Sequence, residues 1–334
     1  MSQLSLPHRI LRFTNKLRVL GPRQAFRSVT ALFTAPPAQR FPLANADPDL
    51  MLASGVSAIR DFARKQSRSN LKKEDSRKDL TSHFPHVYDH SDGRSMRYAF
   101  FPALERSKGL VVVFHGYLGF EIYPLRYSWK HFDLLIPYDN FGWKSLGSWF
   151  WGTGGENYVE QMTQALIQKT LQQRGQTRWF CVGASMGGFA ALYHGIKHAA
   201  DGVYAMTPII DLKSKIDDYR KRNIQTSYTE VAAAEDARLQ RVPDIYAEAR
   251  AAQSLPPLFL IQNQYDRTNP FGSATLPLLQ CYEDKKGWLG LRVQPAIGHQ
   301  GHDGSYEEAQ YFFEMIASKT PPRVVDFYNQ DEGG

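Results

Sequence analysis

The chain has 334 residues, of which 43% are apolar, and it carries a net charge of +7 at neutral pH. This length accommodates an α/β domain of roughly 250 residues with an extension better than two domains of equal size. Two cysteines, Cys181 and Cys281, are too few for a disulfide framework and form no zinc-ligand pattern. The chain is therefore neither a disulfide-rich domain nor a small zinc-binding domain.

The positive charge is concentrated at the start of the chain. Residues 1–80 hold 15 Lys and Arg against 6 Asp and Glu, and residues 1–40 hold no acid at all. We interpret residues 1–85 as a basic, partly helical N-terminal extension. It could make peripheral contact with an anionic membrane or protein surface, act as an Arg-rich targeting segment, or pack on the domain as a basic helix.

No apolar run in the sequence reaches the length of a signal-peptide core or of a membrane span. We therefore expect a soluble, cytoplasmic protein, and we expect no nucleic-acid partner.

Residues 86–320 show short apolar runs that alternate with helical patterns. The predicted strands cover residues 98–101, 109–114, 131–138, 179–182, 202–210, 257–262 and 291–296. The predicted helices cover residues 156–173, the stretch after residue 186, and 306–319. Such alternation predicts a mostly parallel central sheet flanked by helices, with ligands bound at the carboxyl ends of the strands.

Two further segments complete the predicted organisation. Residues 211–255 are polar and helix-forming, and we interpret them as a helical lid inserted over the sheet. Residues 321–334 are expected to form a C-terminal tail.

The stretch around Ser185 is the most informative in the chain. A G-x-S-x-G sequence runs from Gly183 to Gly187, with an apolar strand before it and a helical pattern after it. In a nucleophile elbow the serine backbone is strained and its neighbours must be small, so that strand and helix can approach each other. The alternative is a glycine-rich turn with an idle serine.

Three reactive residue types follow separate predicted strands in the order Ser185, Asp266, His299. A serine hydroxyl becomes nucleophilic when an imidazole removes its proton, and a carboxylate orients that imidazole and stabilises its charged form. Backbone N–H groups of Met186 and Tyr117 are the candidates for an oxyanion hole.

Alternatives stay open for two of these roles. Asp266 could be a loop cap, with Asp211, after the preceding strand, as the acid. His302 lies three residues beyond His299 and is the rival base. The two histidines could also be metal ligands, but no further His or Cys cluster lies nearby, and we expect no metal site.

The order of the three residues, the elbow, the His115-Gly116 turn and the Asp-x-x-x-Pro sequence that starts at Asp266 resemble the α/β-hydrolase superfamily over roughly residues 95–320. The resemblance implies the α/β-hydrolase fold, an eight-stranded sheet with a cap inserted after the sixth strand, and serine-hydrolase chemistry at the positions named above. No family within the superfamily is identified.

The expected function is a serine hydrolase that cleaves a carboxylic ester, a small-molecule acyl ester, through an acyl-enzyme intermediate. An acyltransferase or thioesterase on the same triad, with O-acylated sugars among its substrates, stays open, as does a non-catalytic binding protein. Three tryptophans between residues 141 and 151 could line the pocket or pack in the core. The chain has no phosphate-cradling glycine loop, and no cofactor is expected.

Overall fold

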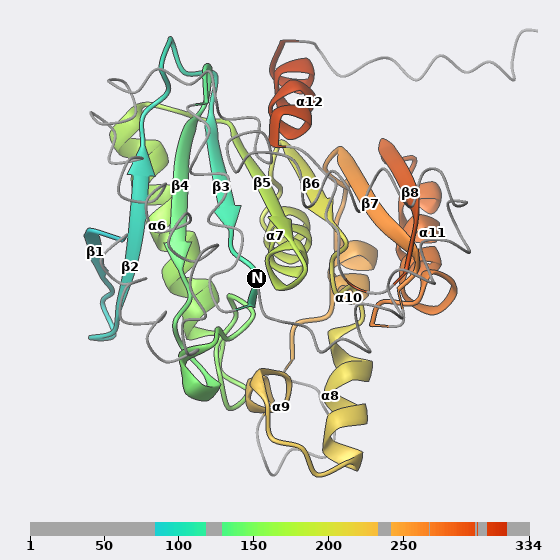
Figure 1. The fold of residues 1–334 in the computed structure, drawn as a ribbon. Coiled ribbons are helices and arrows are strands. Elements are labelled where there is room, and N and C mark those ends of the chain that lie inside the picture. The colour runs from blue at the N-terminus through green and yellow to red at the C-terminus, as the bar shows by residue number, and fades with distance from the viewer. Residues whose placement is uncertain are drawn as a thin grey trace, which may run out of the picture.

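The computed structural model describes residues 84–117, 129–232, 242–266, 268–297, 299 and 306–318. Within these ranges, eight strands form one sheet in the order β1-β2-β4-β3-β5-β6-β7-β8. The sheet is twisted across its width, and helices cover both of its faces (Figure 1). The predicted α/β class, with a mostly parallel sheet, is confirmed.

Only the first edge of the sheet is antiparallel. Strand β2 (Ser95–Phe101) pairs antiparallel with both β1 (His86–Asp89) and β4 (Asp133–Tyr138). From β4 onward all neighbours are parallel. These strands are β3 (Leu110–Phe114), β5 (Trp179–Ala184), β6 (Gly202–Met206), β7 (Leu258–Tyr265) and β8 (Leu289–Ile297). Strands β3, β5 and β6 are buried along their whole length, as continuous apolar runs predict.

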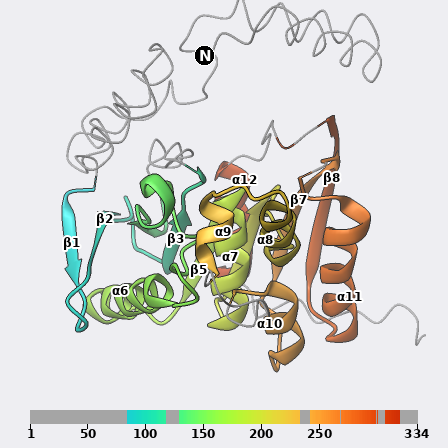
Figure 2. The ribbon, with the colours of Figure 1, turned by 90° about the horizontal axis from the view of Figure 1, so that it is seen from below.

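Two hydrophobic cores lie on opposite faces of the sheet. One lies beneath α6 (Tyr158–Arg174), α7 (Met186–Lys197), α10 (Ile245–Ala251) and α11 (Leu276–Asp284). The other packs beneath α12 (Tyr306–Ser318), whose Phe312 and Phe313 meet apolar side chains of β3 to β6. Seen from below, α12 lies across the sheet from α6 and α7 (Figure 2). Strands β3 to β6 are therefore covered on both sides, which explains their continuous burial, whereas the edge strand β8 leaves Leu291 and Val293 exposed.

The strand boundaries differ from the predicted ones in two places near the site. Strand β6 ends at Met206 instead of residue 210, because Thr207 takes a positive φ of 38° and turns the chain. Strand β7 continues three residues past the predicted end, to Tyr265, through polar residues that still pair with β8. The apolar pattern thus continues past the end of β6, across Thr207 and Pro208, and stops before the end of β7, so it does not set the length of either strand.

The segment predicted as a lid contains three described helices. They are α8 (Leu212–Lys221), α9 (Ser227–Val231) and α10. Helices α8 and α9 lie beyond the carboxyl ends of the parallel strands (Figure 1), whereas α10 packs beside α7 in the helical layer. The insertion follows the sixth strand, as the resemblance implies.

The predicted extension and tail fall mostly outside the described residues. Within the extension only Phe84 and Pro85 are described, and Phe84 is fully buried and stacks on Tyr138 at 4.4 Å between ring centroids. The packing of the domain thus begins slightly before residue 86. No helix in the described ranges combines the length and apolarity that crossing a lipid bilayer requires.

Candidate active site

Ser185 lies between β5 and α7 in a strained conformation, with φ 55° and ψ −116°. Such a conformation costs a non-glycine residue on the order of 1–3 kcal/mol, so the surroundings must hold it. Its N–H donates to the carbonyl of Met206 at 3.0 Å, and its own carbonyl accepts from the N–H groups of Phe189 and Ile209. The strained turn that the G-x-S-x-G sequence predicts is present, and bonds to the helix and to the next strand fix it.

The glycines of the elbow are required by close backbone contacts. A Cβ at Gly183 would collide with the carbonyl of Gly187, and a Cβ at Gly187 would collide with the carbonyls of Phe114 and His115. A Cβ at Gly188 would lie only 3.0 Å from Pro208. Strand β5, helix α7 and the end of β3 can therefore approach each other only when these side chains are missing.

The structure brings the three predicted residues together. The hydroxyl of Ser185 lies 2.8 Å from Nε2 of His299, and Nδ1 of His299 lies 2.6 Å from Oδ2 of Asp266. The acceptor at Nδ1 favours a proton on that nitrogen, which leaves Nε2 as the acceptor that faces the serine. The rival base, His302, lies outside the described residues.

Asp266 is 2% exposed, and its second oxygen accepts from the backbone N–H groups of Thr268 at 2.8 Å and Asn269 at 3.2 Å. Burial alone favours the neutral acid, but the hydrogen bond and the charge of His299, together with these N–H groups, hold the pKa of Asp266 below its usual range. Asp266 thus caps its loop and also faces the histidine, so the contacts expected from each of the two interpretations are present.

The alternative acid, Asp211, has another function. It caps α8, where its carboxylate accepts from the N–H of Ser214 at 3.0 Å and from the Ser214 hydroxyl at 2.6 Å. The loop after β6 is instead joined to the Asp266 loop by Asn269, whose side-chain oxygen accepts from the N–H of Ile210 at 2.9 Å.

The turn after β3 is fixed by a buried histidine. His115 donates from Nδ1 to the carbonyl of Gly116 at 2.8 Å, and its Nε2 accepts from the N–H of Asp139 at 3.0 Å. Burial lowers the pKa of His115 to about 4, so the ring stays neutral. Because C=O and N–H point in opposite directions in a trans peptide, the bond to Gly116 also sets the direction of the Tyr117 N–H.

The second candidate oxyanion donor is the first residue of α7. Met186 is 1% exposed, and its backbone N–H belongs to the first turn, where helical N–H groups have no acceptor within the helix. It directly follows Ser185, which is the position that an oxyanion donor of an elbow requires.

Comparison with known proteins gives the fold. The chain resembles the Pyrococcus horikoshii acylaminoacyl peptidase with a TM-score of 0.53 and 15% sequence identity, over 71% of this chain and 42% of that one. A puromycin-hydrolyzing peptidase of Mycobacterium tuberculosis gives a TM-score of 0.52 at 16% identity, over 70% and 40%. A prolyl endopeptidase gives a TM-score of 0.52 at 15% identity, over 70% of this chain and 38% of that one.

The strand order and these likenesses agree. The chain has the α/β-hydrolase fold. It spans about two fifths of the length of the peptidases that it resembles. No protein-family model matches the sequence, and no curated protein matches it.

Within the α/β-hydrolase fold, the aromatic segment after β4 is packed into the domain. Trp149, Phe150 and Trp151 are at most 6% exposed and belong to the core beneath α6 and α7. Trp143, by contrast, is partly exposed, with the Lys144 ammonium 4.4 Å from its ring centre. For these three buried residues, core packing is the correct interpretation.

Asp139 organises this segment. Its buried carboxylate accepts hydrogen bonds from the N–H and hydroxyl of Ser148 and from the N–H groups of Phe150 and Phe141, at 2.7 to 3.3 Å. Burial raises the pKa of Asp139 to about 6 despite these bonds. The sequence places Asp139 directly after the apolar end of β4, but its pattern does not reveal this role.

Helix α9 adds aromatic residues that the sequence analysis also missed. Tyr228 stacks on Tyr219 with centroids 4.9 Å apart and tilts against Trp149 at 4.8 Å. Burial raises the pKa of Tyr228, and the neighbouring Tyr219, Tyr117 and Asp266 add to the effect. These residues lie far apart in the sequence, and no local pattern joins them.

Two histidines, one in α7 and one at its C-terminal cap, bond to neighbouring segments of the domain. His194 is fully buried, its Nε2 donates to the carbonyl of Phe150 at 2.9 Å, and its pKa is lowered to about 4 by burial. His198 bonds the buried carboxylate of Glu160 at 2.9 Å. Among the described residues, no three His, Cys, Asp or Glu side chains gather in a way that could hold a metal ion.

Proposed function

We propose that this protein is a serine hydrolase that cleaves a carboxylic ester, with Ser185 as nucleophile, His299 as general base and Asp266 as the orienting acid. The proposal rests on one observation, the continuous chain of contacts from the Ser185 hydroxyl through both nitrogens of His299 to Asp266, at 2.8 and 2.6 Å. Both distances are within hydrogen-bond reach for proton transfer.

In the proposed reaction, Nε2 of His299 takes the proton of Ser185 as the oxygen attacks the ester carbonyl. Asp266 accepts the Nδ1–H bond and stabilises the imidazolium, for which its low pKa is suited. The negative oxygen of the tetrahedral intermediate accepts from the N–H groups of Met186 and Tyr117. The strained backbone of Ser185 holds its hydroxyl in place before substrate arrives.

The intermediate then collapses. The bond to the alcohol oxygen breaks, the alcohol leaves with the proton held by His299, and an acyl group remains on Ser185. A water molecule attacks this acyl-enzyme with the same histidine as base, and the products are a carboxylic acid and the free serine. An alcohol leaves more readily than an amine, and we therefore assign esters in place of the peptide bonds that the structurally similar peptidases are named for.

The first test is labelling of the full chain by a fluorophosphonate probe, read by mass. Wild-type protein should gain one label on Ser185, and Ser185→Ala should gain none. The same variant should lower kcat on 4-nitrophenyl esters by on the order of 10⁴ or more, while its melting temperature stays unchanged because only one hydroxyl is lost. Labelling at a different serine would refute the assignment.

A second test addresses the bond that is cleaved. Wild-type protein is assayed against 4-nitrophenyl esters of short and long acids and against peptide 4-nitroanilides at equal concentration. We expect kcat/KM to be larger for the esters. Faster cleavage of the anilides, with Ser185→Ala inactive, would keep the serine hydrolase and reject the ester.

A further inference from the structure

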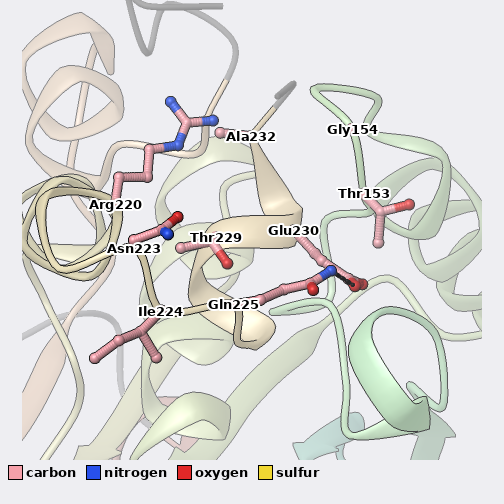
Figure 3. Close-up of a pocket in the computed structure, with 9 residues that line it drawn as sticks. All are labelled: Thr153, Gly154, Arg220, Asn223, Ile224, Gln225, Thr229, Glu230 and Ala232. Atoms are coloured by element: carbon pink, nitrogen blue, oxygen red, sulfur yellow. Dashed lines mark hydrogen bonds between the residues drawn. The ribbon is translucent and has the colours of Figure 1, made fainter. Parts of the chain in front are cut away.

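A hollow lies beside helix α9, and none of its lining residues belongs to the Ser185 site. Its volume is about 660 Å³, within the range of roughly 300–1,000 Å³ that small-molecule pockets occupy. Figure 3 shows Arg220, Asn223 and Ile224 on one side and Thr153 and Gly154 on the other, with residues of α9 and the turn before it between them.

Hydrogen bonds fix helix α9 against the wall of the hollow that Thr153 and Gly154 form. The N–H of Gly154 donates to the carbonyl of Glu230 at 2.7 Å, and the N–H of Gly155 donates to that of Val231 at 2.8 Å. The indole N–H of Trp149 also donates to the carbonyl of Ser227 at 3.1 Å. Helix α9 is thus tied to the loop after β4 at both of its ends.

The turn before α9 is equally well defined. Thr226 and Thr229 form a reciprocal capping box. The Thr229 hydroxyl accepts from the backbone N–H of Thr226, and the Thr226 hydroxyl accepts from the backbone N–H of Tyr228. Asn223 takes a left-handed conformation with φ 55°, which asparagine tolerates better than most residues. The side chains at positions 223 and 225 are therefore carried on an ordered turn.

The lining has the chemistry of a site for hydroxyl groups. The amides of Asn223 and Gln225 each donate and accept, as a sugar hydroxyl does, and Thr153 adds a hydroxyl. One arginine and one glutamate leave the lining without net charge, and Gln225 already donates to Glu230 at 3.2 Å. An acyl chain would need a mostly apolar wall, which is missing here, since Ile224, 41% exposed, is the one large apolar side chain of the lining.

Helix α9 connects this hollow with the Ser185 site. Tyr228 packs toward Trp149 and lies near Asp266 and Tyr117, while its neighbours Thr229 and Glu230 line the hollow. We propose that the hollow binds a neutral saccharide, and this inference does not rest on the proposed function.

The binding test uses the full chain with Ser185→Ala, so that no substrate is consumed. Calorimetry measures binding of two neutral saccharides, cellotetraose and chitotetraose, and of a tetrapeptide of similar size. We expect at least one saccharide to bind and the peptide not to bind. Binding of the peptide alone, or of neither saccharide, overturns the proposal.

The location is tested by a double variant, Asn223→Gly with Gln225→Ala. Glycine accepts the left-handed backbone at position 223, so the variant removes two amides without straining the turn. We expect saccharide affinity to fall at least about tenfold, and Gln280→Ala, an exposed amide on α11, to leave it unchanged. Undiminished saccharide affinity in the double variant, confirmed as folded by its melting temperature, overturns the site.

Fluorophosphonate labelling of wild-type protein separates the two proposals. A chain that is labelled on Ser185 but binds no saccharide keeps the hydrolase and loses the saccharide site. A chain that binds saccharide at the hollow but is not labelled keeps the site and loses the hydrolase.

Discussion

Two buried aspartates at the carboxyl ends of the strands have pKa values shifted in opposite directions. Asp139 follows β4 and Asp266 follows β7, and both are at most 2% exposed. Asp139 accepts only from neutral N–H and hydroxyl groups, and burial raises its pKa to about 6. Asp266 has fewer backbone donors but also faces His299, and its pKa is lowered.

The comparison indicates that the histidine partner, through its hydrogen bond and then its charge, keeps Asp266 ionised despite burial, and Asp139 has no such partner. Asp139 is suited to holding a loop in one conformation. Asp266 is suited to stabilising a positive charge that forms on the histidine during a reaction.

The largest expected effect comes from removing the partner of Asp266. His299→Ala should lower kcat/KM on a 4-nitrophenyl ester by on the order of 10⁴ or more, since nucleophile and base act as a unit. The double variant with Ser185→Ala should lose no more than either single variant. His302→Ala is the matched control and should cost only a modest factor, because the contact with Ser185 is made by His299. An inactive His302→Ala together with an active His299→Ala would refute the base assignment.

Asp266→Asn should have the next largest effect, a loss of kcat/KM on the order of 10³ to 10⁴. The amide that replaces Oδ2 can donate to Nδ1 of His299, and this favours the tautomer whose Nε2 carries the proton and cannot accept one from Ser185. Asp139→Asn is the comparison variant and should cost less than about tenfold at a temperature where it is folded. Equal losses in both variants would mean that Asp266, too, acts only by holding its loop.

The sequence predicted the sheet and the three residues for a common reason. Each of Ser185, Asp266 and His299 follows an apolar run, and in a parallel sheet the carboxyl ends of such runs meet at one edge. The glycines at 183 and 187 also predicted a close approach of strand and helix, and the structure shows that a Cβ at either position would collide with backbone carbonyls.

What the sequence did not predict depends on contacts between distant segments. Tyr228 reaches Trp149 across 79 residues, and the hollow combines Thr153 with residues 220–232. Helix α11 was missed because its short sequence mixes apolar and polar residues without a clear helical period. The end of β6 was placed too late because the apolar pattern continues past Pro208. Asp139 was missed because a carboxylate after a strand has the same pattern whether it holds a loop or a histidine.

The smallest expected effect is on stability, and it tests the electrostatic difference itself. Because the pKa of Asp139 is raised from 3.8 to about 6, the folded chain binds the proton more tightly than the unfolded chain. Stability from this group is therefore fully present below about pH 4 and is lost as pH rises through 6, by about 3 kcal/mol in total. Asp266 has the opposite sign: its lowered pKa gives stability that is present above about pH 4 and lost as pH falls further.

Urea unfolding of wild type, Asp139→Asn and Asp266→Asn at several pH values between 3 and 7.5 separates the two signs. Asparagine does not titrate, so the stability of wild type relative to Asp139→Asn should shrink as pH rises from 4 to 7. Relative to Asp266→Asn it should stay constant over that range and shrink only as pH falls below about 4. A wild-type advantage over Asp139→Asn that stays constant or grows with pH would show that the Asp139 carboxylate is ionised as readily when folded as when unfolded. Its difference from Asp266 would then lie only in what each side chain contacts.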